Sequence, residues 1–213
     1  MNSLKRTALL LLLGSAALLA SAAQAAPVTV TGFGMKYSGA PTGTVGYAGA
    51  INARIYAGEI ALRTTDGPLD AFCIDVTTSL RAGDYESTSQ NAYGAGSAVP
   101  LNFELIGKLY DHYYSQANTA EGSAAFQLAL WAIVNGTDTS NSSPFGGATT
   151  TANTWLGSLG SLNSVGLYSF SVLEPDTTNQ RLLTSTLVPE PGTLALLGMG
   201  LLGAGFARRR RAS

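Results

Sequence analysis

Residues 124–134 read AAFQLALWAIV, and ten of these eleven residues are apolar. A segment that is apolar on every side is typical of a helix buried in a protein core. The exception is Gln127, whose carboxamide must be buried with its neighbours. A buried amide without a partner costs about 1–3 kcal/mol, so the sequence predicts that Gln127 has a specific polar partner.

Two helices are expected in this part of the chain. Residues 101–114 place apolar side chains on one stripe, and residues 121–134 form the second helical pattern, with Gly136 just past its end. On the second helix, Gln127 shares a face with Leu130 and Trp131.

Strand patterns surround the two helices. Asp66-Gly67-Pro68 is a turn signal, and residues 81–100 are polar and are predicted to form a loop. Residues 137–166 are predicted to be long loops around a short element. Strands are expected at residues 28–33, 44–65, 71–80, 167–174 and 181–188. The order of strands, helices and strands predicts an α+β fold, a β-rich domain with a two-helix insertion that carries Gln127.

The first 25 residues have the three parts of a secretory signal peptide. Lys5 and Arg6 precede an apolar run, and Ala23-Gln24-Ala25 places small residues where a signal peptidase reads. We expect cleavage after Ala25 and export of the remaining chain.

The C-terminal end, residues 189–213, also has three parts in a fixed order. Pro189-Glu190-Pro191 is followed by the apolar run Leu194 to Ala207 and then by Arg208, Arg209, Arg210 and Arg211. The run is short for a membrane span, which takes about 20 residues, and the arginines favour a cytoplasmic end. A simple tail anchor would also fit this pattern.

This end resembles the PEP-CTERM sorting signal of Gram-negative bacteria. The resemblance implies that the chain is held transiently in the inner membrane by a C-terminal transmembrane helix. It further implies that an exosortase cuts near Pro189-Glu190-Pro191 and that the protein then reaches the cell surface or an extracellular matrix.

Between the two ends, residues 26–188 form the expected extracellular domain. They hold six basic and twelve acidic residues, a net charge of 6 − 12 = −6, which argues against nucleic-acid binding. The chain shows no zinc spacing, calcium loop or phosphate loop, so no cofactor or metal is expected.

The domain holds one cysteine, Cys73, in the run Phe72-Cys73-Ile74-Asp75. A single cysteine in an exported chain cannot form an internal disulfide. Side chains alternate along a strand, so Cys73 shares its face with Asp75, which makes a purely apolar environment for the thiol less favourable. A small residue packed in the core is the alternative.

Phe72-Cys73-Ile74-Asp75 and Gln127-Leu128-Ala129-Leu130-Trp131 together resemble the two motifs of thioester domains in bacterial surface adhesins. That family often has Thr before the Gln, where this chain has Phe126. The resemblance implies an internal thioester between the Cys73 sulfur and the Gln127 carbonyl carbon. A target amine or hydroxyl would open it in a single turnover, so the protein would not be an enzyme.

A thioester needs a dry pocket, and Phe72, Phe126 and Trp131 are the residues expected to build it. Asp75 is the candidate for handling a proton or orienting the sulfur.

Two other interpretations stay open at this point. One is a non-covalent surface protein that binds exopolysaccharide, biofilm matrix or another carbohydrate, with Cys73 and Gln127 merely packed. The other is a cysteine hydrolase that pairs Cys73 with His112, the sole histidine.

Overall fold

The computed structural model describes residues 26–46, 54–93, 100–143, 145–175 and 178–189, and the structural statements below concern this part of the chain. The predicted signal peptide and the predicted C-terminal membrane segment lie outside it. Among the described helices, none combines the length and the apolar character needed to cross a membrane.

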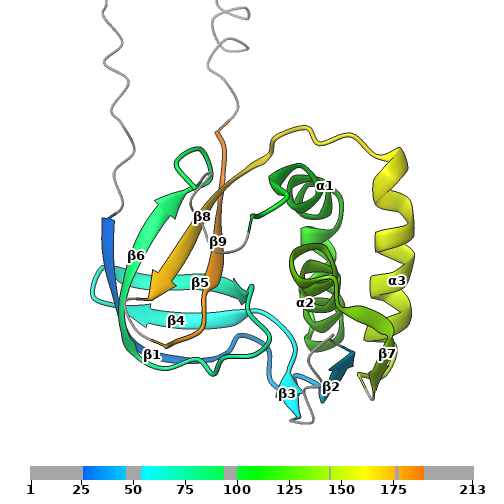
Figure 1. Ribbon diagram of the computed structural model, residues 1–213, viewed down its shortest axis with the longest axis horizontal. Coiled ribbons are helices and arrows are strands. Elements are labelled where there is room, and N and C mark those ends of the chain that lie inside the picture. The colour runs from blue at the N-terminus through cyan, green and yellow to red at the C-terminus, as the bar shows by residue number, and fades with distance from the viewer. Residues whose placement is uncertain (1–25, 47–53, 94–99, 144, 176–177, 190–213) are drawn as a thin grey trace, which may run out of the picture.

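A closed barrel of antiparallel strands forms one half of the molecule (Figure 1). The order around the barrel is β1 (Ala26–Met35), β4 (Ile60–Thr64), β5 (Gly67–Cys73), β9 (Leu182–Leu187), β8 (Tyr168–Pro175) and β6 (Gly83–Ser89). Along β4, Ile60 and Leu62 are buried while Ala61 and Arg63 are exposed, which is the period-two pattern of a strand with one face in a core. The predicted strands 28–33, 167–174 and 181–188 are confirmed as β1, β8 and β9.

The prediction of a loop over residues 81–100 is wrong in its first half. Residues Gly83–Ser89 form β6, which pairs with β1 on one side and with β8 on the other and so closes the barrel. The segment is polar because most of its side chains remain partly or fully exposed, and Tyr85 is its large buried side chain. Polar composition therefore hid the alternation that marks a strand.

Two other predicted strands are shorter than expected. The predicted strand 44–65 is interrupted and contributes to β2 (Thr42–Gly46), β3 (Ile55–Tyr56) and β4. The predicted strand 71–80 ends at Cys73, the last residue of β5. The turn signal at Asp66 is confirmed, since β4 and β5 form a hairpin with the pair Thr64↔Gly67 at its end.

The two predicted helices are confirmed as α1 (Phe103–Tyr113) and α2 (Ala120–Asn135). The Thr119 hydroxyl caps the start of α2 by accepting a hydrogen bond from the Gly122 N–H at 3.0 Å. Gly136 ends α2 in the left-handed conformation with φ of 62°, which glycine adopts without strain. Residues Ser123 to Trp131 are all buried, as the apolar pattern predicts.

The insertion between β6 and β8 is larger than the predicted pair of helices. Within the described residues it adds α3 (Ala148–Ser158), the short 3₁₀ turns η1 (Tyr114–Gln116) and η2 (Leu159–Ser161), and β7 (Asp138–Ser143). Strand β7 pairs with β2 in a small sheet of order β3-β2-β7. The Thr-rich sequence of α3 gives little helical signal, but Trp155 anchors the helix by stacking on Tyr113 with ring centroids 4.9 Å apart.

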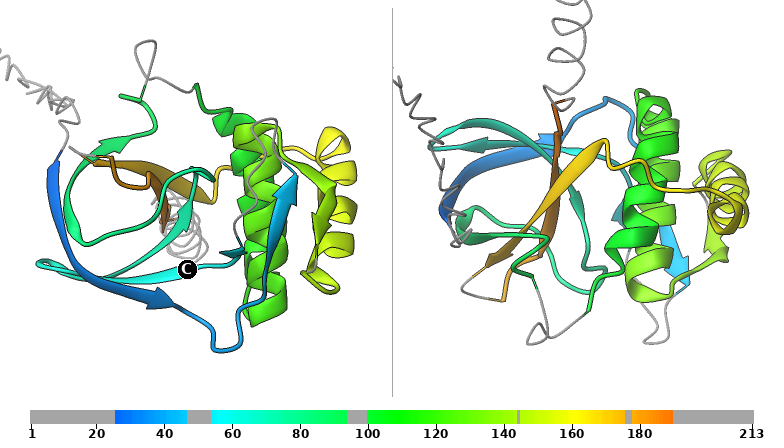
Figure 2. Two further views of the ribbon diagram at one scale, coloured as in Figure 1. Left: turned by 60° about the horizontal axis from the view of Figure 1, so that its bottom comes forward. Right: turned by 90° about the horizontal axis from the view of Figure 1, so that it is seen from above.

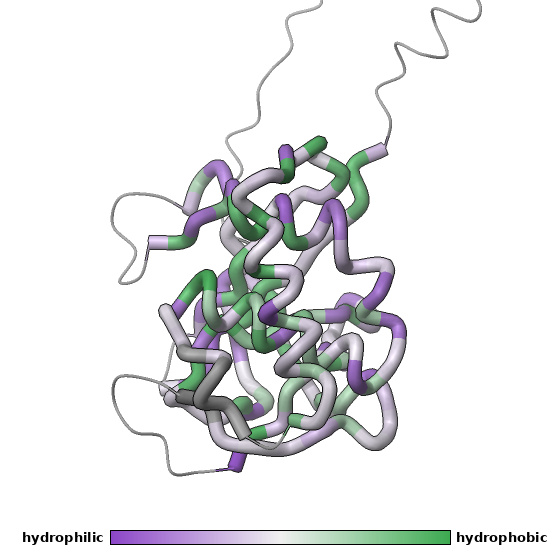
Figure 3. The backbone as a smooth tube through the Cα atoms, turned by 90° about the vertical axis from the view of Figure 1, so that its right-hand side faces the viewer, coloured by the Kyte–Doolittle hydropathy of each residue, from purple (hydrophilic) through white to green (hydrophobic). Residues whose placement is uncertain are grey.

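The helices cover one side of the barrel, with α2 between the barrel and α3 (Figure 2). Hydrophobic residues gather toward the middle of the molecule, and hydrophilic ones lie mainly along its outline (Figure 3). Phe72 of β5 and Phe126 of α2 meet in this core, with ring centroids 4.8 Å apart. The fold is therefore α+β as predicted: an antiparallel barrel with a helical insertion whose buried helix carries Gln127.

Candidate functional site

Cys73 is the last residue of β5 and faces the region where the barrel meets the helical insertion. Its side chain is 7% exposed, and the thiol is free. Burial, with the negative charge of Asp75 as a second cause, raises the pKa of the Cys73 thiol above its ordinary value. The sulfur therefore stays protonated, unlike the activated thiolate of a cysteine hydrolase.

Gln127 pairs with the main chain of Cys73. The Cys73 N–H donates to Gln127 Oε1 at 3.0 Å, and Gln127 Nε2 donates to the Cys73 carbonyl at 2.7 Å. The neighbouring Ile74 N–H donates to the Arg181 carbonyl on the β9 side, so the Cys73 amide points toward the β4 side. On that side the pairing between β4 and β5 has already ended, because its last pair is Ile60↔Ala71.

The carboxamide of Gln127 thus takes the place of a missing strand partner. It satisfies two buried backbone groups that would otherwise be unpaired. This arrangement explains why an otherwise apolar helix carries a glutamine, and it brings the two predicted site residues together. It does so through the main chain of Cys73 rather than through the sulfur.

The sulfur of Cys73 contacts a different glutamine, Gln180. Cys73 Sγ lies 2.9 Å from Gln180 Oε1, and Gln180 is 8% exposed. Gln180 stands two residues before β9, the strand that pairs with β5 through Cys73↔Leu182. The pairing of these two strands is what brings Gln180 to the thiol.

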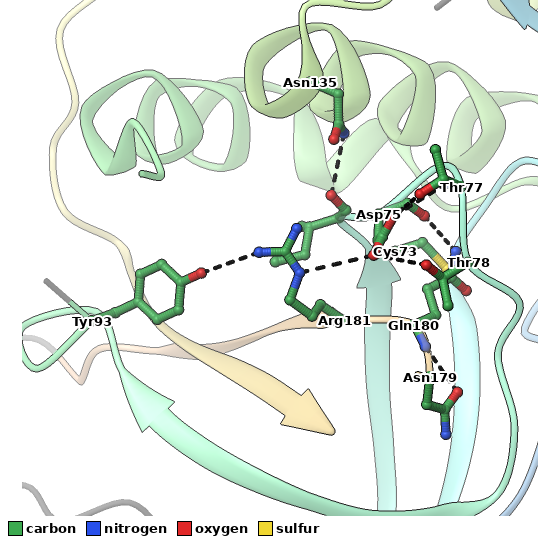
Figure 4. A network of polar contacts seen from close by, with 10 residues as sticks. Cys73, Asp75, Thr77, Thr78, Tyr93, Asn135, Asn179, Gln180 and Arg181 are labelled. Carbon is green, nitrogen blue, oxygen red and sulfur yellow. Dashed lines mark hydrogen bonds and ion pairs between the residues drawn. The ribbon is translucent and has the colours of Figure 1, made fainter. Parts of the chain in front are cut away.

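Besides its contact with the sulfur, Gln180 is held in place by two described hydrogen bonds (Figure 4). Its Nε2 donates to the Asp75 carbonyl at 2.5 Å, and its backbone N–H donates to Asn179 Oδ1 at 2.8 Å. Asn179 is itself clamped, because it exchanges two hydrogen bonds with the backbone of Arg81 at 2.8 and 2.9 Å. The carboxamide is therefore oriented with its oxygen toward the sulfur and its nitrogen toward the strand end.

Asp75 organises the turn after Cys73. Its carboxylate accepts hydrogen bonds from the Thr77 N–H at 3.1 Å, the Thr77 hydroxyl at 3.0 Å and the Thr78 hydroxyl at 3.1 Å. Arg181 Nε lies 3.9 Å from Asp75 Oδ2, so the residue after Gln180 is tied to the same turn (Figure 4). Asp75 therefore fixes the turn that follows Cys73, and its charge is the second cause of the raised pKa of the thiol.

The three aromatic residues predicted to form a dry pocket separate into two groups. A cavity of about 400 Å³ lies beside Cys73 and Gln180, and Trp131 lines it. Phe72 and Phe126 do not line it; they pack with Tyr110 and Tyr114 in the aromatic core. Phe72 lies outside the cavity because neighbouring residues of a strand point to opposite faces, and Cys73 is the one that faces the cavity.

His112 stands apart from this cluster. It lies in the last turn of α1, and its Nε2 is 2.8 Å from the Asn163 carbonyl. The described hydrogen-bond partner of the Cys73 sulfur is Gln180, so the geometry does not supply the Cys–His pair of a hydrolase.

Gln180, Asn179 and Arg181 are the site residues that the sequence interpretation missed. Within the sequence, Gln180 is one amide in a polar run before a strand, and no local pattern marks it. Knowing that β5 pairs with β9 would have identified it, because the residues before β9 must then lie beside the end of β5.

Comparison with known proteins gives a match at the C-terminal end. The family model described as the PEP-CTERM protein-sorting motif matches residues 187–211. This match confirms the predicted sorting signal and shows a protein that is exported and sorted to the cell surface. A comparison with curated protein sequences gave no significant match.

Among solved structures, the chain is similar to the N-terminal thioester domain of a surface protein from Clostridium perfringens. The identity is 17%, the TM-score is 0.42, and the match covers 69% of this chain and 98% of the other. It is also similar to the N-terminal domain of the Streptococcus pyogenes pilus tip adhesin Cpa. There the identity is 18%, the TM-score is 0.46, and the coverage is 73% and 99%.

Proposed function

We propose that this protein is an exported surface protein that attaches covalently to its target through an internal thioester between Cys73 and Gln180. The observation that carries the proposal is the buried contact of 2.9 Å between Cys73 Sγ and the Gln180 carboxamide. Formation of the bond joins the sulfur to the Gln180 Cδ atom and expels the amide nitrogen as ammonia. A buried thiol packed on a buried, immobilised carboxamide is the arrangement this reaction requires.

Gln180 replaces Gln127 as the proposed acyl partner. Both polar atoms of the Gln127 side chain are engaged with the Cys73 main chain, where they fix the end of β5. Gln127 then acts as a positioning residue that holds the sulfur-bearing residue at a set place relative to Gln180. Asn179 and Asp75 position the other partner in the same way.

The attachment reaction consumes the thioester once. A target amine or hydroxyl attacks the Gln180 carbonyl carbon, the carbon–sulfur bond breaks, and the nucleophile's proton ends on the Cys73 sulfur. Because burial raises the pKa of the Cys73 thiol, the departing sulfur is released in its protonated form. The products are an amide or ester on residue 180 and a free Cys73 thiol.

The ends of the chain serve its delivery. A signal peptidase removes residues 1–25, and the segment 189–213 holds the precursor in the inner membrane with residues 26–188 outside. An exosortase then cuts near Pro189-Glu190-Pro191 and passes the protein to the cell surface or the extracellular matrix. The matched sorting motif supports this route.

The intact mass of the exported protein, before and after methylamine treatment, tests the thioester. We expect a mass short by one ammonia, to which hydrolysis adds one water and leaves Glu at position 180, and to which methylamine adds one methylamine. Peptide mapping then locates the methylamide. A methylamide on residue 180 supports the proposal, whereas a methylamide on residue 127 would show that Gln127 is the acyl partner. An unmodified mass together with a freely titratable Cys73 thiol in freshly folded protein would exclude the thioester. The remaining interpretation would then be a surface protein that binds non-covalently.

A further inference from the structure

The cavity beside the proposed thioester has the size of a ligand site. Its volume is about 400 Å³, and known ligand pockets span ~300–1,000 Å³. Cys73 and Gln180 both line it, so a molecule bound there lies next to the acyl carbon. The chemistry of the remaining lining therefore indicates which nucleophile the protein selects.

The described lining contains no Asp, Glu, Lys, Arg or His side chain. Lys36 and Glu59 follow two lining residues in the chain, but they pair with each other at 3.0 Å. A lysine ammonium entering this cavity would lose water without gaining a counter-ion, which is costly. The lining favours a ligand without charge.

Two aromatic side chains of the lining remain open to solvent. Phe33 of β1 is 41% exposed and Tyr56 of β3 is 64% exposed, which places two apolar ring faces at the accessible part of the cavity. Flat apolar faces of this kind pack on the C–H faces of sugar rings while the ring hydroxyls stay hydrated.

The buried part of the lining offers neutral hydrogen-bonding groups. Trp131 is 1% exposed, and its Nε1–H has no acceptor among the described residues. A buried donor without a partner is rare and costs free energy, so a ligand oxygen that accepts from it would gain affinity. Thr78 and Ser79 add neutral polar groups to the same lining.

We propose that this cavity binds a neutral carbohydrate and that the Cys73–Gln180 thioester esterifies one of its hydroxyls. The inference rests on the proposed thioester and names its target class. In the step, a sugar hydroxyl oxygen attacks the Gln180 carbonyl carbon, the carbon–sulfur bond breaks, and the hydroxyl proton passes to the Cys73 sulfur. One ester and one thiol replace one thioester and one alcohol, so the step needs no further reactant.

The test uses the full chain, expressed with export and purified in mild detergent. It is incubated separately with maltohexaose, cellohexaose and Nα-acetyl-lysine N-methylamide at equal concentrations, and adducts are followed by intact mass. We expect an oligosaccharide adduct to form at least about tenfold faster than the lysine adduct. Hydroxylamine should remove the sugar, because it cleaves esters and leaves amides intact.

Variants of the lining separate recognition from reactivity. Tyr56→Ala and Trp131→Phe should each slow oligosaccharide capture by about tenfold. Methylamine labelling of each variant, followed in parallel, measures the reactivity of the thioester apart from recognition of the sugar, and the slowing of oligosaccharide capture should exceed any slowing of methylamine labelling. Val165→Ala is the control, since Val165 is an exposed apolar residue outside the lining.

Faster capture of the lysine compound, or no oligosaccharide adduct in a protein that reacts with methylamine, would overturn the carbohydrate inference and leave the thioester in place. Undiminished capture of oligosaccharide by Tyr56→Ala and Trp131→Phe would also overturn it. If methylamine forms no adduct with the wild-type protein, both the proposed thioester and the carbohydrate inference are refuted.

Discussion

Cys73 and Gln180 are 107 residues apart in the chain, yet the sulfur of one lies 2.9 Å from the carboxamide oxygen of the other. A covalent bond between them would close a loop that spans β6, the whole helical insertion and β8. By analogy with disulfides, closing a loop of this length lowers the entropy of the unfolded chain and stabilises the fold by about 5 kcal/mol in the chain-entropy model.

Cys73→Ala and Gln180→Ala should therefore each lower the free energy of unfolding by about 5 kcal/mol. The double variant should lose little more than either single variant, because both remove the same bond. Thermal unfolding of the three variants at one scan rate measures this. Fully additive losses would show that the two side chains stabilise the fold separately and are not cross-linked.

Gln127→Ala should destabilise the protein by about 2–4 kcal/mol, because it leaves the N–H and carbonyl of Cys73 buried without partners. Asn135→Ala is the matched control, since it removes a single hydrogen bond, to the Ile74 carbonyl, from the same helix. Its cost should be about 1 kcal/mol. Methylamine should still label residue 180 in the folded fraction of Gln127→Ala, and loss of labelling in correctly folded protein would contradict a purely positioning role.

Asp111 predicts a pH dependence of stability. Burial opposes ionisation, but hydrogen bonds from the Ser164 hydroxyl and from the N–H groups of Val165, Gly166 and Leu167 outweigh it and lower the pKa of Asp111. A lowered folded-state pKa means that Asp111 stabilises the fold above the unfolded pKa of about 4, and that this stability is lost as pH falls through the folded value.

Asp111→Asn should accordingly lower the melting temperature at pH 7. The difference in melting temperature between the variant and the wild type should shrink as the pH falls below about 4. Melting curves at several pH values from 7 down to well below about 4 provide the measurement. A constant difference between the two proteins over the whole range would show that the hydrogen bonds do not depend on the Asp111 charge.

Glu59 is buried beside Lys36, and the Tyr114 hydroxyl donates to its carboxylate. Burial raises the pKa of Glu59, and the hydrogen bonds from Tyr114 and Lys36 limit that rise. Because the folded pKa lies above the unfolded one, the contribution of Glu59 to stability is largest below the unfolded pKa and declines as pH rises toward the folded pKa.

Lys36→Met removes the cation and should raise the pKa of Glu59 further. We expect a loss of about 2–3 kcal/mol at pH 7.5, less than for a fully buried pair because Lys36 is 30% exposed. The loss should be smaller at pH 4.5, because the raised pKa leaves Glu59 less ionised there than at pH 7.5. Lys108→Met is the control, since its partner Glu104 lies on the exposed surface of α1. An equal loss at both pH values would show that Glu59 is not ionised in the wild type.

Deleting Arg208 to Arg211 should impair sorting without changing the melting temperature of the processed domain, because these residues act at the membrane. Replacing the four arginines with lysine keeps the positive charge and should preserve sorting. Fractionation of cells that express each variant measures the outcome, and normal processing without any basic cluster would refute the role of the charges.

Much of the fold follows from local patterns. Alternation predicted β1 and β8, strand-like composition suggested β9, and the apolar run around Gln127 predicted the buried helix α2. Strand β6 was missed, and α3 was expected only as a short element of unspecified type within the loops of residues 137–166. A polar barrel strand and a Thr-rich helix are stabilised by tertiary contacts such as those of Tyr85 and Trp155 rather than by composition.

The sequence by itself determined the sorting signal, the single cysteine in its aromatic–Cys–Ile–Asp run, and the need of Gln127 for a buried polar partner, and it predicts a signal peptide at residues 1–25. Only the tertiary structure decided which carboxamide meets the sulfur. Gln127 satisfies the backbone at the open end of β5, and the pairing of β5 with β9 brings Gln180 to the thiol. The physical reason is that strand pairing between segments more than one hundred residues apart leaves no periodic trace in either segment, whereas a signal peptide, a helix and a sorting motif are each encoded in adjacent residues.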